Sequence, residues 1–181
     1  MQKIIISLLI FIFSSISNAD ERKNELDRLF NELKIKDFLI SQKTEQQIWD
    51  IWSTHPTDDK LTLILSEGSK FVRNQQLSDA IDVFTKVIQL DPTWAEAWNK
   101  RATVLYLLGD YEGSQKDIDK VLELEERHFG ALAGQGMVNI QLKNYDKAKR
   151  SYQKVQEIYP AMKSPKVMIE QIEELIKRQS I

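Results

Sequence analysis

Residues 95–128 read AEAWNKRATVLYLLGDYEGSQKDIDKVLELEERH, and the same pattern recurs 34 residues earlier and 34 residues later without a gap. In blocks that start at Leu61, Ala95 and Phe129, the eighth position is always small and the twentieth is Ala or Ser. The twenty-fourth, twenty-seventh and thirtieth positions carry large apolar or aromatic side chains in every block. A fixed period of this length indicates a repeat architecture, in which each repeat stacks on its neighbours to bury a continuous core.

The small residues indicate where helices cross within each block. Two antiparallel helices approach closely only where a side chain is nearly absent, and larger apolar residues fill the space alongside. The eighth and twentieth positions of the three blocks are Gly68 and Ala80, Ala102 and Ser114, and Gly136 and Ala148. Each block is therefore predicted to be one pair of antiparallel helices.

This pattern resembles the tetratricopeptide repeat (TPR). Trp98 stands at that family's aromatic fourth position, and Gly109-Asp110-Tyr111 stands at its turn between the two helices. The resemblance implies an all-α, right-handed helical solenoid of three repeats, at residues 61–94, 95–128 and 129–162. The whole chain is also similar to periplasmic TPR proteins of alphaproteobacteria, through the segments 48–52, 98–103 and 127–132.

The flanks of the repeats are predicted to cover the two open ends of the solenoid. Residues 20–60 contain two apolar helical stripes and are expected to form a helical hairpin docked on the first repeat. These stripes are Leu26, Leu29, Phe30 and Leu33, then Ile48, Trp49, Ile51 and Trp52. Residues 163–181 are expected to form a capping helix, with Ser164 as its cap, Pro165 in its first turn, and a stripe of Ile169, Ile172, Leu175 and Ile176.

Residues 1–19 have the features of a cleaved export signal. Lys3 supplies a positive start, an apolar run with a single serine covers 4–13, and Ser17-Asn18-Ala19 offers small residues before a cut. The alternative is a membrane anchor, but the apolar stretch is shorter than the roughly 20 residues that span a bilayer. We therefore expect a mature chain that starts at Asp20, has no membrane span and is periplasmic or secreted.

The composition excludes several classes of function. The chain has 181 residues, 25 Lys plus Arg against 27 Asp plus Glu, and no cysteine. A net charge of −2 gives no reason to expect nucleic acid as a partner, and the absence of cysteine excludes disulfides and thiolate metal sites. The two histidines, His55 and His128, lack metal-ligand spacing, and His128 is interpreted as a contact at a helix end. We expect no catalytic residue, no metal site and no cofactor.

In the TPR family the first helix of each pair lines a concave groove. The resemblance places nine residues of the second and third repeats there as a candidate peptide-binding groove: Glu96, Asn99, Thr103, Tyr106, Gly130, Ala133, Gly134, Met137 and Ile140. Helix crossing explains neither Gly130 nor Gly134, although each glycine within a helix costs about 1 kcal/mol relative to alanine. They are predicted to form a bare apolar patch for a partner backbone, or alternatively to allow tight packing beside Phe129.

The seventh position of each block is polar, where the family usually has leucine. These residues are Glu67, Arg101 and Gln135, and we expect them to stack as an internal polar ladder in which Arg101, between the other two, forms a satisfied ion pair. In the alternative interpretation, Arg101 turns to the groove and meets an acidic group of a ligand.

Together these features predict a protein-protein interaction module. We expect a scaffold or assembly factor of the bacterial cell envelope that binds a peptide or a helix in the concave groove. The alternative is a structural subunit of an envelope complex that binds through its convex face or its caps. An enzyme is the least supported class, because the sequence has no arrangement of nucleophile, base or metal ligands. The sequence does not predict an oligomeric state.

Overall fold

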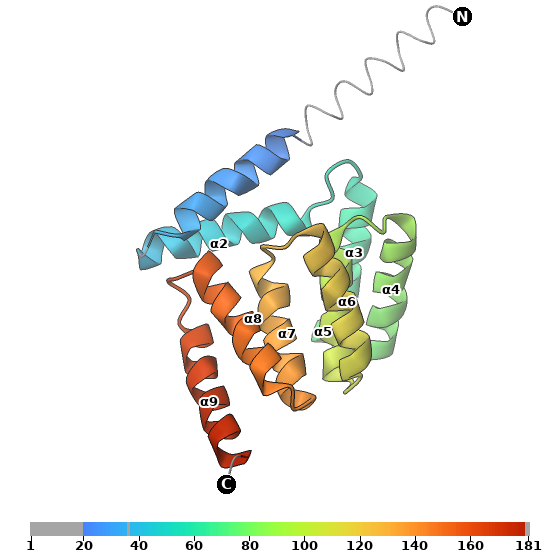
Figure 1. Ribbon diagram of the computed structural model, residues 1–181. Coiled ribbons are helices and arrows are strands. Elements are labelled where there is room, and N and C mark those ends of the chain that lie inside the picture. Colours follow the sequence, from blue (N-terminus) through green and yellow to red (C-terminus); the bar gives the residue numbers. More distant parts are fainter. Residues whose placement is uncertain (1–19, 36, 180–181) are drawn as a thin grey trace, which may run out of the picture.

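The computed structural model describes residues 20–35 and 37–179, and within them every regular element is a helix (Figure 1). The predicted export signal at residues 1–19 lies outside this part. None of the described helices combines the length and the apolar character that a membrane crossing needs.

Three pairs of antiparallel helices stand side by side (Figure 1). The first pair is α3 (Asp59–Arg73) and α4 (Leu77–Leu90), and the second is α5 (Ala95–Leu107) and α6 (Tyr111–Leu124). The third pair is α7 (Phe129–Gln141) and α8 (Tyr145–Ile158). The predicted all-α solenoid of three repeats is confirmed.

The small residues allow the close crossings that the sequence predicts. A Cβ atom added at Gly68 would lie 2.5 Å from the ring of Phe84, and one added at Gly136 would collide with the ring of Tyr152. Either contact is too short for a real side chain, so the large aromatic residue of each second helix fills the space that glycine leaves in the first.

The turn inside each pair has the same backbone in all three repeats. Gln75, Gly109 and Lys143 lie 34 residues apart, and all have positive φ angles, of 62°, 81° and 59°. Each is followed by a residue whose N–H donates to the carbonyl five residues earlier, as Asp110 does to Leu105 at 3.0 Å. This pattern is the Schellman motif, which favours glycine at the left-handed position. Only the second repeat has glycine there.

The N-terminal hairpin does not dock on the first repeat as expected. It consists of helical residues 20–33 and α2 (Phe38–Ser53), and α2 runs across the ends of the repeat helices (Figure 1). Its core contains Ile48 and Trp52 together with Phe129 of α7 and Tyr159, which follows α8.

The hairpin also reaches the junction between the first and second repeats, because the indole N–H of Trp94, the last residue of the first repeat, donates to the carbonyl of Trp52 at 2.8 Å. The physical reason for this position is that the junctions between repeats, which carry Trp94, Phe129 and Tyr159, lie along one edge of the solenoid. A helix laid across that edge buries apolar groups of several repeats at once.

The C-terminal helix α9 (Ser164–Gln179) packs against α8. Ile172 is fully buried there with Ala148 and Tyr152, and Ile169 and Ile176 join the same cluster. Helix α9 therefore covers the open side of the third repeat, as its apolar stripe predicts.

Candidate functional site

A small cavity of about 80 Å³ lies between α5 and α7, with Ser114 and Ile118 of α6 also lining it. Six of the nine predicted groove residues line it: Asn99, Thr103, Tyr106, Gly130, Gly134 and Met137. The three from α5 are spaced i, i+4, i+7, and so are the three from α7. This spacing places each set in one stripe along its helix, so the two stripes face each other across the cavity.

Polar groups of α5 stand at the edge of this cavity. The Asn99 amide donates to the carboxylate of Glu96 at 2.9 Å, and the Thr103 hydroxyl donates to the carbonyl of Asn99 at 3.0 Å. Among the described residues, neither the amide oxygen of Asn99 nor the hydroxyl of Tyr106 has a hydrogen-bond partner. These two groups can bind the backbone of a peptide, while Ile118 and Met137 offer apolar contact.

The two glycines of α7 have different environments. A Cβ atom added at Gly134 would have only Ile118 Cδ1 within 4 Å, at 3.6 Å, so no packing contact requires glycine there. A Cβ atom added at Gly130 would lie 2.6 Å from the ring of Trp49. Close approach of α2 therefore explains Gly130, and the expectation that both glycines are bare for a partner is wrong for this one.

Three other predicted groove residues are engaged within the chain. Glu96 is almost fully buried, and Ala133 and Ile140 pack with the cluster that α9 completes. Because the N-terminal hairpin and α9 cover these residues, only the central part of the predicted groove stays open.

Glu96 belongs to a buried polar cluster beneath α2. The Nδ1 atom of His128 accepts a hydrogen bond from the N–H of Ala131 at 3.1 Å, so Nε2 carries the proton and donates to Glu96 Oε2 at 3.1 Å. The His128 ring stacks on Trp52 with 3.9 Å between the ring centroids. His128 is therefore a helix-end contact, as predicted, and it also joins the hairpin to two repeats.

The charge of Glu96 is stabilised despite its burial. Lys100 Nζ lies 3.0 Å from Glu96 Oε1, an ion pair whose geometry is not that of a hydrogen bond. Burial alone would raise the pKa of Glu96, but the hydrogen bond from His128 and the charge of Lys100 outweigh it, and the pKa lies below its usual value. The ionised carboxylate is thus the form that the fold favours.

The predicted polar ladder of Glu67, Arg101 and Gln135 is wrong. Arg101 forms a two-pronged ion pair with Asp117 of its own repeat, at 2.7 and 2.8 Å. Gln135 accepts a hydrogen bond from Ser151 at 2.8 Å, and these two residues occupy the same positions in the third repeat as Arg101 and Asp117 do in the second. The seventh position therefore faces the second helix of its own repeat.

The first repeat lacks the polar partner for its seventh residue. Val83 occupies the place of Asp117 there, and Glu67 is exposed. The alternative interpretation, in which Arg101 meets a ligand acid in the groove, is also unsupported, because Asp117 and Thr85 bind its guanidinium group.

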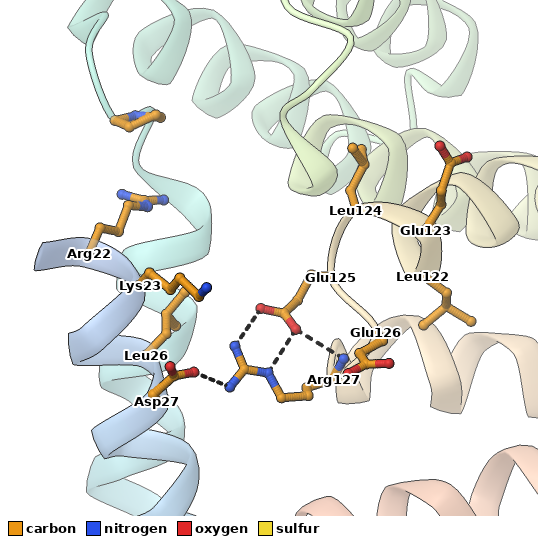
Figure 2. Close-up of a pocket in the computed structure, with 11 residues that line it drawn as sticks. Arg22, Lys23, Leu26, Asp27, Leu122, Glu123, Leu124, Glu125, Glu126 and Arg127 are labelled. Carbon is orange, nitrogen blue, oxygen red and sulfur yellow. Dashed lines mark hydrogen bonds and ion pairs between the residues drawn. The ribbon is translucent and has the colours of Figure 1, made fainter. Parts of the chain in front are cut away.

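A larger cleft of about 680 Å³ separates helical residues 20–33 from the chain between α6 and α7 (Figure 2). Figure 2 shows Arg127 at its centre, bound to Glu125 at 2.9 Å and to Asp27 at 2.5 Å. Sequence reasoning missed this cleft, because it depends on where the hairpin docks. Its lining mixes both charges and its central arginine is already paired, so it selects no class of ligand.

Both histidines have structural partners. His55 accepts a hydrogen bond from the N–H of Asp58 at 2.9 Å and pairs with the carboxylate of Asp91 at 2.8 Å. In the described part of the chain, no three His, Asp or Glu side chains gather as a metal site would require.

Comparison with known proteins identifies the repeats. Residues 95–128 and 130–162 match the tetratricopeptide repeat family. A TPR repeat-containing protein of Rhizobium etli is 29% identical over 153 residues, which cover 84% of this chain and 74% of that protein. Human RNA polymerase II-associated protein 3 is 25% identical over 141 residues, which cover 76% of this chain but only 21% of that protein.

Solved structures share the fold. The first TPR domain of Spaghetti (RPAP3), bound to an HSP90 peptide, has a TM-score of 0.64 at 21% identity, with 65% of this chain and 94% of that one covered. The crystal structure of MamA has a TM-score of 0.61 at 20% identity, with 76% and 78% covered. Identities this low show a common solenoid architecture and nothing more specific.

Proposed function

Because this chain contains tetratricopeptide repeats, we propose that it is a protein-interaction module that binds a peptide segment in the central groove, without catalysing a reaction. The observation that carries the proposal is the cavity between α5 and α7, next to a glycine, Gly134, that no packing contact requires. The structural neighbour that holds an HSP90 peptide gives a precedent for this architecture.

The size of the cavity limits what it can hold. A cavity of about 150 Å³ accommodates benzene, so the 80 Å³ here suits one small branched side chain. The unpaired oxygen of Asn99 and the hydroxyl of Tyr106 would then bind the peptide backbone on either side of it. We infer an extended segment with one small apolar anchor residue.

The proposed location is the bacterial cell envelope, where the module would act as a scaffold or assembly factor. The support is the apolar sequence of residues 1–19 with small residues before Asp20, and a relative from Rhizobium etli. N-terminal sequencing of the protein released by opening the outer membrane tests this location. We expect a chain that starts at Asp20, whereas a chain that starts at Met1 and stays with the membranes would contradict it.

Crosslinking in cells tests the binding mode. A photoreactive residue at Met137, which is exposed beside the cavity, should capture the partner. The matched control is the same residue at Leu90, which is exposed at the end of the second helix of the first repeat. Adducts from Leu90 and none from Met137 would favour the alternative, a structural subunit bound through its convex face.

A further inference from the structure

Four large apolar side chains are exposed together where the N-terminal hairpin turns. Ile35, Phe38, Leu39 and Ile40 have 48%, 60%, 74% and 44% of their surface exposed, and we call these four residues the hairpin tip. The other exposed large apolar residues lie singly or in pairs along the rest of the described chain. A contiguous apolar patch on a folded protein indicates a contact surface.

The packing of α2 leaves the hairpin tip uncovered. The buried side of α2 is made of Ser41, Thr44, Ile48 and Trp52. Ser41 and Thr44 hydrogen-bond to the end of the first hairpin helix, and Ile48 and Trp52 pack against the repeats. The tip lies at one edge of the molecule, beside the connection between α8 and α9 (Figure 1). It is a convex turn, which can insert side chains into a soft surface but forms no groove for a ligand.

Lysines surround the hairpin tip. The Nζ atom of Lys163 lies 5.7 Å from the centre of the Phe38 ring, which places it on the same surface. Lys34 precedes the tip, and Lys43 lies one helical turn after Leu39. Lys34 and Lys43 are exposed and form no ion pair with any described residue.

The nearby acidic groups each have a hydrogen-bond or ion-pair partner within the protein. The Asp37 carboxylate accepts a hydrogen bond from the N–H of Ile40 at 2.9 Å and so caps α2. Glu32 binds Arg28, and Glu45 accepts a hydrogen bond from the hydroxyl of Tyr159 at 2.9 Å. Asp37 is exposed and keeps its negative charge, but the three lysines outnumber it, so the tip presents apolar groups and an excess of positive charge to its surroundings.

We propose that the hairpin tip docks on an anionic phospholipid bilayer, with Phe38 and Leu39 in the interfacial layer and the lysines at the lipid phosphates. Apolar insertion combined with basic side chains is the pattern that binds proteins peripherally to such surfaces. A second copy of the chain fits less well, because pairing two tips would bring their lysines together. The proposal is independent of the groove and needs no membrane span.

The lysines determine how strongly vesicle binding should depend on charge. Each lysine near an anionic surface contributes about 1 kcal/mol, so removing two should weaken binding about 30-fold. Salt should weaken it as well, because the screening length falls from about 30 Å at 0.01 M to about 10 Å at 0.1 M.

Vesicle flotation of the protein purified from cells tests the proposal. The vesicles are phosphatidylcholine with or without phosphatidylglycerol, and the variants are Phe38→Ser with Leu39→Ser, and Lys34→Gln with Lys163→Gln. The matched control is Leu63→Ser, which removes an equally exposed leucine of α3 (70%) away from the tip. Circular dichroism verifies that each variant is folded.

We expect wild type and Leu63→Ser to float only with anionic vesicles, and both tip variants to lose at least tenfold in binding. Equal flotation of the tip variants and wild type would overturn the proposal, as would binding that ignores phosphatidylglycerol. Concentration-dependent dimers that Leu39→Ser abolishes, without lipid binding, would assign the tip to a second copy instead.

Discussion

Replacing His128 with alanine should severely destabilise the fold, because this side chain joins the hairpin to two repeats. The ring is fully buried, and it contacts Glu96, the N-terminus of α7 and Trp52. The substitution would remove all three contacts and leave the buried carboxylate of Glu96 with only Lys100 and the amide of Asn99 beside it.

The magnitude follows from these contacts. Removing a buried hydrogen bond to a charged group costs about 1.5 to 3 kcal/mol, losing a helix cap costs about 1 kcal/mol, and the aromatic stack adds about 0.5 to 1.5 kcal/mol. The contacts share one ring and do not add fully, so we expect a loss of about 4 kcal/mol in the free energy of unfolding. That is a large share of the roughly 5 to 15 kcal/mol typical of a domain.

Urea unfolding followed by tryptophan fluorescence measures this loss, since Trp49 and Trp52 both contact the His128 ring. The matched control is His55→Ala. His55 likewise accepts a backbone hydrogen bond from the residue three positions later and has a carboxylate partner, but the side chain of Asp91 is 22% exposed, so water can replace the lost hydrogen bond. We expect about 1 to 2 kcal/mol for the control. A loss at His128 no greater than at His55 would refute the reasoning.

Four further predictions concern the same fold. Lys143→Gly should raise the free energy of unfolding by about 0.5 to 1 kcal/mol, because glycine relieves the left-handed backbone. Gly109→Ala should lower it by about 1 to 2 kcal/mol, and thermal melts that move the other way would contradict both. Arg101→Ala should cost about 3 kcal/mol in urea unfolding, since the Asp117 side chain is only 6% exposed, whereas a loss below about 1 kcal/mol would show a solvent-screened pair. Because the fold lowers the pKa of Glu96, its ionised carboxylate adds stability, which is complete above the unfolded pKa of about 4.3 and is lost as the pH falls through the folded pKa. Glu96→Gln should therefore reduce the loss of unfolding free energy with falling pH. An unchanged dependence on pH would refute this prediction.

The repeat core was predictable from sequence because its signal is local and periodic. The 34-residue spacing gives the starts of α5 and α7 at Ala95 and Phe129 directly, and the small eighth positions lie where the helices cross. The left-handed turns at Gln75 and Lys143 recur at the same period, although no glycine indicates them.

The predictions that were wrong concern contacts between residues that are distant in sequence. Periodicity shows that the N-terminal hairpin is amphipathic, but not which surface buries its apolar face. Trp49 therefore came to lie against Gly130, about eighty residues away, and half of the predicted bare patch was already occupied. The prediction of the partner of Arg101 was wrong for a related reason. The seventh position is interpreted correctly only when the second helix of its own repeat is considered.

The most direct test of the proposed groove is the affinity of a Gly134→Leu variant for the peptide captured through Met137, measured by isothermal titration calorimetry. The leucine side chain should fill the cavity without a clash, so the variant should be at least as stable as wild type. Because a buried apolar anchor is worth about 1.5 to 3 kcal/mol, we predict an affinity loss of about 10- to 100-fold. An affinity equal to that of wild type would contradict the claim that the peptide lies between α5 and α7, and an unfolded variant would show that Gly134 belongs to the core.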